Sequence, residues 1–304
     1  MCDSPTPLLA SHSARPSNRN RRLPLQPTQH KEMYEAYWQL ERKPFENTSD
    51  TRFYFPGEAH QGALLKLRYA VENRRGAALL TGASGLGKSL LVQTLARQLS
   101  EEFTPLVHLV FPDMPPAQLL AYLADELSGS FAATAPTIAQ SVRQIEMILA
   151  DAADAGKHPV VVIDEAHLLR DGPALDTLRL LTNFQFHTRP ALTLLLVGQP
   201  SLLPTLDRMV DLDERMGVKC LLRPLTREES LGYIRHRLSA AGAQRTIFRD
   251  EALDTVHELS QGVARRINRL CDLALLIGYA EEQSELGTTQ IEAVARELAT
   301  VTPE

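Results

Sequence analysis

The chain has 304 residues, of which 44% are hydrophobic and 23% charged, as expected for an ordinary globular protein with one large domain or two. Its net charge of −5 argues against a globally basic nucleic-acid-binding surface, and its three widely spaced cysteines suit a reducing compartment and lack metal-ligand spacing. No apolar run approaches the roughly 20 residues of a membrane span, so we expect a cytoplasmic protein.

The first 30 residues are predicted to be a disordered tail, because they are rich in proline, serine and arginine and lack periodic apolar residues. Their arginines could contact phosphates or acidic lipids, although a solvated tail is favoured. Residues 33–45 then gather several aromatic side chains, including the only tryptophan, Trp38. This segment could stack on a base, but packing at the edge of the domain is the preferred interpretation. A helix is predicted over residues 58–75.

A phosphate-binding loop is predicted over residues 82–89, which read Gly-Ala-Ser-Gly-Leu-Gly-Lys-Ser between a short apolar strand and a segment of helical periodicity. Glycines let backbone N–H groups surround a phosphate chain, and the following helix adds positive charge from its N-terminus. We therefore expect ATP to bind at this loop, with Lys88 on the β- and γ-phosphates and the Ser89 hydroxyl on Mg²⁺. A glycine-rich turn that fits by chance is the alternative. The predicted nucleotide-binding residues are Gly82, Ala83, Ser84, Gly85, Leu86, Gly87, Lys88, Ser89 and Leu90.

The second half of the predicted site is an acidic pair at the end of a strand over residues 158–163. That strand is rich in valine and too apolar for a surface position, so it is expected at the centre of a parallel sheet. Asp164 would anchor Mg²⁺ through Ser89 or water, and Glu165 would orient and deprotonate the attacking water. Capping of the next helix is the alternative role for this pair. Before it, we predict a strand over residues 105–111 and helices over residues 117–127 and 137–155.

A further polar residue, Gln199, ends the next buried strand, over residues 191–197. We expect it to lie beside the acidic pair and to hydrogen-bond the attacking water or the γ-phosphate, with a turn-forming role as the alternative. A helix over residues 173–187 precedes this strand, and a last strand over residues 218–222 follows it.

Only helices are predicted beyond residue 224. Thr226 and Glu229 form a predicted capping box for a helix that ends near residue 241, and a second box, from Thr289 to Glu292, opens the last helix, over residues 289–299. Two more helices are expected over residues 250–261 and 265–279. The predicted fold class is therefore α/β, a P-loop NTPase whose parallel five-stranded sheet is sandwiched by helices over residues 31–223, with a small all-α lid over residues 224–304.

In the order of these motifs, the chain resembles the AAA+ ATPases of the general secretion pathway protein A (ExeA) type. Those proteins share an ATPase domain with transposition helper ATPases such as TniB and MuB. The resemblance covers about residues 33–300, and Ala264 departs from it by standing where a proline is usual. Besides the aromatic segment, the loop and the acidic pair, it rests on residues 196–200, 233–238 and 262–272.

The resemblance implies three further roles. Gln199 takes the place of the γ-phosphate sensor, Arg215 that of the arginine finger that reaches a neighbouring subunit's nucleotide, and Arg265 that of a lid arginine that contacts the nucleotide in its own subunit. From the residues alone, Arg265 could lie on a solvated helix face. Arg215 could equally form a surface ion pair with Asp211, Asp213 or Glu214.

The sequence thus predicts a Mg²⁺-dependent ATPase that works as a homo-oligomer, as a ring or a filament. It would couple ATP turnover to the assembly or remodelling of an unidentified protein complex in secretion or the cell envelope. The alternative function is a DNA-associated transposition helper; the shared domain and the arginine-bearing tail support it, whereas the acidic charge of the rest of the chain opposes it. A nucleotide-gated scaffold is less well supported, because the acidic pair is intact. A DEAH helicase is also less well supported, because a second RecA-like domain is not predicted.

Overall fold

A five-stranded parallel sheet forms the framework in this computed structural model, which describes residues 34–131, 136–169 and 172–300. The predicted tail over residues 1–30 lies outside the described residues. The strands follow the order β2-β3-β6-β1-β7, and all four neighbouring pairs are parallel. Their bounds are β1 (Ala77–Gly82), β2 (Leu106–Leu109), β3 (Val160–Ile163), β6 (Thr193–Gly198) and β7 (Met216–Leu222).

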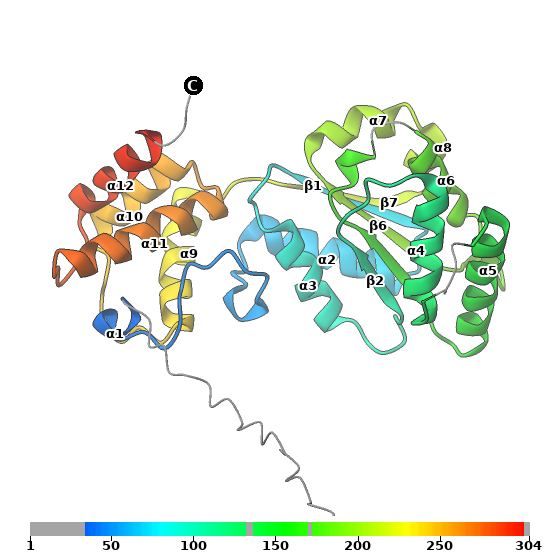
Figure 1. Cartoon of the computed structure of the whole chain (residues 1–304), viewed down its shortest axis with the longest axis horizontal. Helices are drawn as coiled ribbons and strands as arrows, with labels where there is room; N and C mark the ends of the chain where they lie inside the picture. Colours follow the sequence, from blue (N-terminus) through cyan, green and yellow to red (C-terminus); the bar gives the residue numbers. More distant parts are fainter. Residues whose placement is uncertain (1–33, 132–135, 170–171, 301–304) are drawn as a thin grey trace, which may run out of the picture. The chain divides into compact units, whose positions relative to one another are not determined.

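Helices cover both faces of this sheet (Figure 1). Because side chains alternate along a strand, odd and even positions of the buried strands enter different cores. On β3, Val161 and Ile163 pack with helices α4 (Pro116–Ser128), α5 (Ile138–Asp154) and α6 (Pro173–Leu181). Val160 and Val162 pack on the opposite side. The helices there are α2 (Glu58–Glu72) and α3 (Lys88–Gln98). This burial on both faces confirms the prediction of a central parallel strand.

The segment between α6 and β6 differs from the sequence prediction. The helix predicted to reach residue 187 ends at Leu181, and a small antiparallel hairpin of β4 (Gln185–Phe186) and β5 (Arg189–Pro190) follows. Its turn residues, His187 and Thr188, have φ values of 49° and 66°. Turns with two positive φ values usually contain asparagine or glycine, so the sequence carried no signal for this one. Between β6 and β7 lie η3 (Pro200–Leu202), α7 (Leu203–Asp207) and α8 (Val210–Asp213).

Four helices follow the last strand, as predicted: α9 (Arg227–Ala240), α10 (Asp250–Ser260), α11 (Ala264–Ala280) and α12 (Thr288–Thr300). The first capping box is present, since the Thr226 hydroxyl accepts the N–H of Glu229 at 3.2 Å and the Glu229 carboxylate accepts the N–H of Thr226 at 2.8 Å. The second predicted box is wrong. Helix α12 already begins at Thr288, and the Gln290 side chain accepts the N–H of Gly287 at 3.1 Å. Within the described residues, no helix is long and apolar enough to span a membrane.

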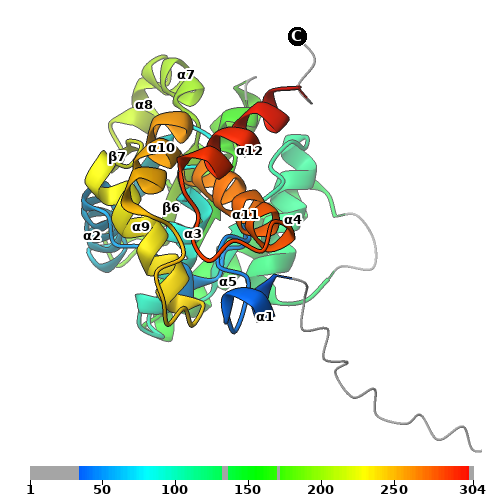
Figure 2. The same ribbon diagram turned by 90° about the vertical axis from the view of Figure 1, so that its left-hand side faces the viewer.

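The aromatic segment packs against the protein, which was the preferred interpretation of its sequence. Its packing partners are the helices that follow the sheet (Figure 2). Its short helix α1 (Glu35–Trp38) lies against α11, where the Trp38 indole donates to the carbonyl of Leu275 at 2.9 Å. The Arg237 guanidinium on α9 donates to the carbonyls of Pro44 at 2.5 Å and Glu46 at 2.8 Å. The 3-10 helix η1 (Thr51–Phe53) then leads to α2. The boundaries predicted at residues 30 and 223 remain predictions.

Candidate nucleotide-binding site

The predicted phosphate loop links β1 directly to α3. Gly85 and Gly87 have φ values of 83° and 88°, which side-chain-bearing residues rarely adopt, and Gly87 is the N-cap of α3. The glycines therefore permit the backbone path that brings the loop to the N-terminus of this helix. A helix N-terminus presents unpaired N–H groups and partial positive charge, which suit an anion.

Lys88 lies inside this loop. Its ammonium group donates to the carbonyls of Gly82 at 2.9 Å and Ala83 at 3.0 Å, and the residue is buried. Burial lowers the pKa of Lys88, while the nearby carboxylates of Glu165 and Asp164 act in the opposite direction. The ammonium group is thus positioned to exchange two loop carbonyls for phosphate oxygens.

Ser89 and Asp164 meet across the gap between α3 and β3. The Ser89 hydroxyl donates to Oδ2 of Asp164 at 2.7 Å, and the N–H of Glu165 donates to Oδ1 at 2.9 Å. On β2, Nε2 of His108 lies 3.4 Å from the same Oδ2. Burial alone would raise the pKa of Asp164, but these hydrogen bonds outweigh it and lower the pKa, so the group is a carboxylate. Hydroxyl and carboxylate oxygens are ligands that Mg²⁺ prefers, so the donor set fits this metal.

Glu165 and Gln199 come from the ends of neighbouring strands. Ile163 pairs with Leu196 in the sheet, which brings the tip of β3 beside the tip of β6. Glu165 has a φ of 51°, and its side chain is 43% exposed. His167 in η2 (Ala166–Leu168) lies between the two side chains, with Nδ1 3.3 Å from Oε2 of Glu165 and Nε2 3.0 Å from Nε2 of Gln199. The sequence therefore predicted the two outer members of this chain of contacts.

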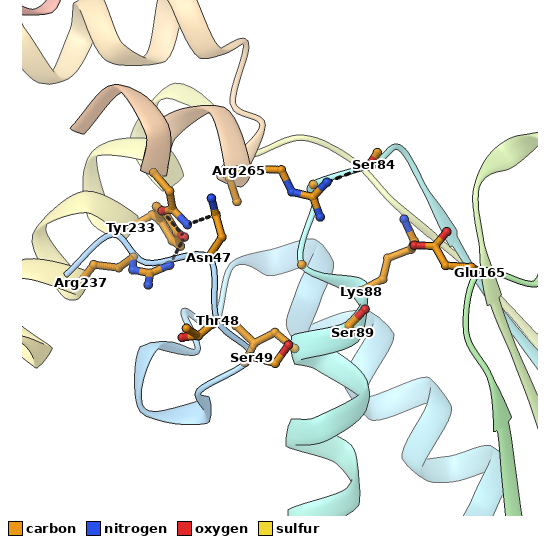
Figure 3. Close-up of a pocket in the computed structure, with 15 residues that line it drawn as sticks. Asn47, Thr48, Ser49, Ser84, Lys88, Ser89, Glu165, Tyr233, Arg237 and Arg265 are labelled. Carbon is orange, nitrogen blue, oxygen red and sulfur yellow. Dashed lines mark hydrogen bonds between the residues drawn. The ribbon is translucent and has the colours of Figure 1, made fainter. Parts of the chain in front are cut away.

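An open pocket lies at the phosphate loop (Figure 3), and Asp164 and Gln199 are not among the described residues that line it. Its lining includes the phosphate loop, the start of α3 and Glu165. The predicted residues at the pocket are joined by others that the sequence analysis did not assign to the nucleotide site. These are Asn47, Thr48, Ser49, Tyr233, Arg237, Ala264 and Asn268.

Three of these additional residues form a polar chain. The Tyr233 hydroxyl donates to Oδ1 of Asn268 at 2.8 Å, and Nδ2 of Asn268 donates to Oδ1 of Asn47 at 3.0 Å. Asn47 and Asn268 are 221 positions apart, and no short sequence pattern links them. Their shared position was therefore accessible only from the three-dimensional structure.

Arg265 contacts the phosphate loop from the N-terminus of α11 (Figure 3). Its backbone N–H donates to the carbonyl of Gly85 at 3.1 Å, and its guanidinium donates to the Ser84 hydroxyl at 3.2 Å. A Cβ added to Gly85 would lie only 2.8 Å from Cβ of Arg265. Gly85 thus allows both the positive φ and the close approach of α11.

Arg215 lies between α8 and β7 and is not among the described residues that border the pocket. It is half-buried, and its guanidinium donates to the carbonyl of Thr182 at 3.3 Å and to the Thr182 hydroxyl at 3.2 Å. Two of the acidic side chains considered as its ion-pair partners contact other residues, since Asp211 pairs with Arg179 and Asp213 with Lys219.

His60 is a further residue that the sequence analysis did not single out. It is buried on α2, and its Nε2 lies 2.7 Å from the carbonyl of Leu86 in the phosphate loop. Burial lowers the pKa of His60, so the neutral ring donates to this carbonyl. The available signal was its place on the apolar face of α2, one turn before Ala63 and Leu64, where a polar residue needs a partner.

Comparison with known proteins agrees with this architecture. A family model described as an AAA domain matches residues 71–206. The chain is 33% identical over 276 residues to general secretion pathway protein A of Aeromonas hydrophila, a match that covers 90% of this chain and 50% of that protein. The chain therefore spans about half the length of this relative.

Solved structures of AAA+ proteins have the same fold. The TM-score is 0.66 for the ORC2 protein of Aeropyrum pernix, at 16% identity over 84% of this chain and 72% of that one. It is 0.68 for Drosophila ORC bound to DNA, at 17% identity over 96% and 71% of the two chains. For the RuvB Holliday junction branch migration motor of Thermotoga maritima it is 0.54, at 21% identity over 79% and 69%. These likenesses confirm the predicted fold class.

Proposed function

We propose that this chain is an AAA+ ATPase that couples Mg²⁺-dependent ATP turnover to the assembly or remodelling of a partner complex in secretion or the cell envelope. The observation that carries the proposal is the meeting of three strand ends. Lys88 and Ser89 follow β1, Asp164 and Glu165 follow β3, and Gln199 follows β6. In the sheet these strands are neighbours in the order β3-β6-β1.

Each of these residues has a distinct proposed role in hydrolysis. Lys88 would release the two loop carbonyls and bind phosphate oxygens, which stabilises the charge that develops on transfer. Ser89 and Asp164 would hold Mg²⁺, which when bound neutralises charge between the β- and γ-phosphates. Glu165, with a side chain that is partly exposed at the pocket, would orient the attacking water and accept its proton. Gln199 would hydrogen-bond the γ-phosphate or the attacking water.

The contact between α11 and the phosphate loop supports coupling to movement. Arg265 contacts both Ser84 and Gly85, so a nucleotide in the loop must share its binding site with the start of α11. We propose that Arg265 transfers its guanidinium from Ser84 to the bound nucleotide. Binding and hydrolysis would then change the position of the helical region, as a ligand with different contacts in two conformations does.

Assembly into an oligomer and the arginine-finger role of Arg215 belong to the same proposal. The name of the Aeromonas relative motivates the secretion setting, although this chain spans only half of that protein. The partner remains to be identified, and duplex DNA is the alternative partner to be tested.

The decisive experiment compares Lys88→Ala and Glu165→Gln in ATP turnover and nucleotide affinity. We expect Lys88→Ala to lose both, and Glu165→Gln to keep the affinity while kcat falls about a hundredfold or more. Lys66→Ala, which alters an exposed lysine on α2, is the matched control and should behave as wild type. Normal turnover by Lys88→Ala would refute the proposal. Stimulation by duplex DNA that declines with salt would favour the transposition-helper function instead.

A further inference from the structure

His60 contacts the phosphate loop from α2, and it is not among the residues to which the proposed mechanism gives a role. The residue is 8% exposed, and its Nε2 lies 2.7 Å from the carbonyl oxygen of Leu86. A Cβ added to Gly87 would lie 3.6 Å from the same Nε2. The imidazole therefore packs against the peptide bond that joins Leu86 to Gly87.

The direction of this peptide bond decides what the loop presents to a ligand. The bond is trans, so its C=O and N–H groups point in opposite directions. Since the Leu86 carbonyl faces His60, the N–H of Gly87 faces away from α2. Gly87 lines the pocket, and no described residue of α2 does. This N–H has no hydrogen-bond partner among the described residues, so it is a free donor for an anion on the pocket side.

The glycine that allows this path also allows the opposite orientation. Gly87 has a φ of 88° and a ψ of 20°. Turning the peptide plane over would change this φ to a negative value, which glycine adopts about as readily. The Leu86 carbonyl would then face the phosphates and repel them. The loop thus needs a group outside itself that favours the orientation in which the N–H faces the pocket.

His60 is placed to supply that preference. The start of α2 is fixed, because the N–H of Glu58 donates to Oε1 of Glu229 at 2.9 Å. A carbonyl can only accept, so Nε2 of His60 carries the proton. Nδ1 is buried and has no partner among the described residues, which costs free energy. An apolar side chain would pack here without that cost, so the contact with the loop is what a histidine adds.

We propose that His60 is a positioning residue that holds the peptide between Leu86 and Gly87 in its anion-binding orientation. The proposal rests on the function proposed above, and it adds to that site a residue outside the loop and the acidic pair. The Gly87 N–H would contact the phosphate chain both before and during hydrolysis. Loss of His60 should therefore weaken nucleotide binding and raise KM, with little change in kcat.

Two amide substitutions separate the contact from the packing. His60→Gln places its amide nitrogen near the position of Nε2, so it can still donate to the Leu86 carbonyl. His60→Asn places its amide near Nδ1 and cannot reach that carbonyl. We expect His60→Asn to raise both KM and the Kd of a non-hydrolysable ATP analogue at least about tenfold, with kcat within about threefold of wild type. His60→Gln should stay within about threefold in all three quantities. His60→Leu, which also lacks the donor, gives the same prediction as His60→Asn if that variant does not fold.

The matched control is His158→Asn, which shortens another buried histidine. Nε2 of His158 lies 2.8 Å from the Thr193 hydroxyl, at the opposite end of β3 from the site. This variant should lose melting temperature as His60→Asn does and keep the wild-type affinity. The inference is overturned if His60→Asn binds nucleotide as wild type does, if His60→Gln loses as much affinity as His60→Asn, or if both Asn variants lose affinity equally. Lys88→Ala is measured alongside, because normal binding in that variant refutes the proposed function, whereas normal binding in His60→Asn alone refutes only this inference.

Discussion

His158 is a buried histidine just before β3, at the opposite end of this strand from the site. The residue is 1% exposed, and Nε2 lies 2.8 Å from the Thr193 hydroxyl. That hydroxyl donates to the carbonyl of Arg75 at 2.9 Å, so the histidine is the donor in its own contact. Burial lowers the pKa of His158 to about 4; nearby Arg74 lowers it further, and Glu102 partly offsets this effect.

This shift predicts a loss of stability in mild acid. As pH falls through 6.5 the unfolded chain takes up a proton at His158, whereas the folded chain does not until about pH 4, so stability is complete above 6.5 and declines below it. His158→Gln keeps a donor for Thr193 but cannot be protonated. Between pH 7 and pH 5, the free energy of unfolding of wild type should therefore fall about 2 kcal/mol more than that of His158→Gln in urea titrations. Parallel pH profiles for the two proteins would contradict this assignment.

At the scale of elements, the functional residues that follow the strands could be predicted from the sequence, whereas the contacts between distant elements could not. The loop after β1 and the acidic pair after β3 follow from local patterns, since each polar residue comes directly after a buried apolar run. His60 and His108 are different, because a single polar residue on α2 or β2 says nothing about which loop or carboxylate it will contact. The hairpin at residues 185–190 was missed for a local reason, since its two turn residues with positive φ are neither glycine nor asparagine.

The contact between α11 and the phosphate loop gives an element-scale prediction. Gly85→Ala must place a side chain at a positive φ and 2.8 Å from Cβ of Arg265, so the loop or the start of α11 has to move. The strain alone costs about 1 kcal/mol. We expect the affinity for ATP analogues, measured by calorimetry, to fall at least about tenfold, because the loop N–H groups lose their alignment.

The control for this substitution is Gly156→Ala. Gly156 has a similar φ of 73°, but an added Cβ would meet nothing within 4 Å. The Gly156→Ala variant should lose about as much stability as Gly85→Ala but keep the wild-type affinity for nucleotide. Equal affinities in the two variants would mean that the approach of Arg265 to Gly85 has no part in nucleotide binding.

For the whole molecule, the position of Arg215 bears on whether active sites are completed by a neighbouring subunit. Its guanidinium is held by Thr182 at the end of α6 and is not part of the pocket in its own chain. A finger acting on a neighbour needs such a position, because it must be presented by the subunit that does not bind the nucleotide. If assembly completes the site, the turnover rate per subunit should rise with protein concentration.

Mixing two inactive variants tests this arrangement directly. Arg215→Ala subunits keep an intact phosphate loop, and Lys88→Ala subunits keep Arg215, so an interface between them contains one complete site. In a random equimolar mixture about one quarter of the sites are complete, and turnover should recover to about a quarter of the wild-type rate although each variant alone is reduced about a hundredfold or more. Arg208→Ala, which alters a nearby exposed arginine, is the matched control and should retain wild-type turnover. A mixture as inactive as its components would exclude Arg215 as a finger acting between subunits. If Arg208→Ala is itself inactive and recovers turnover when mixed with Lys88→Ala, the finger is Arg208 instead.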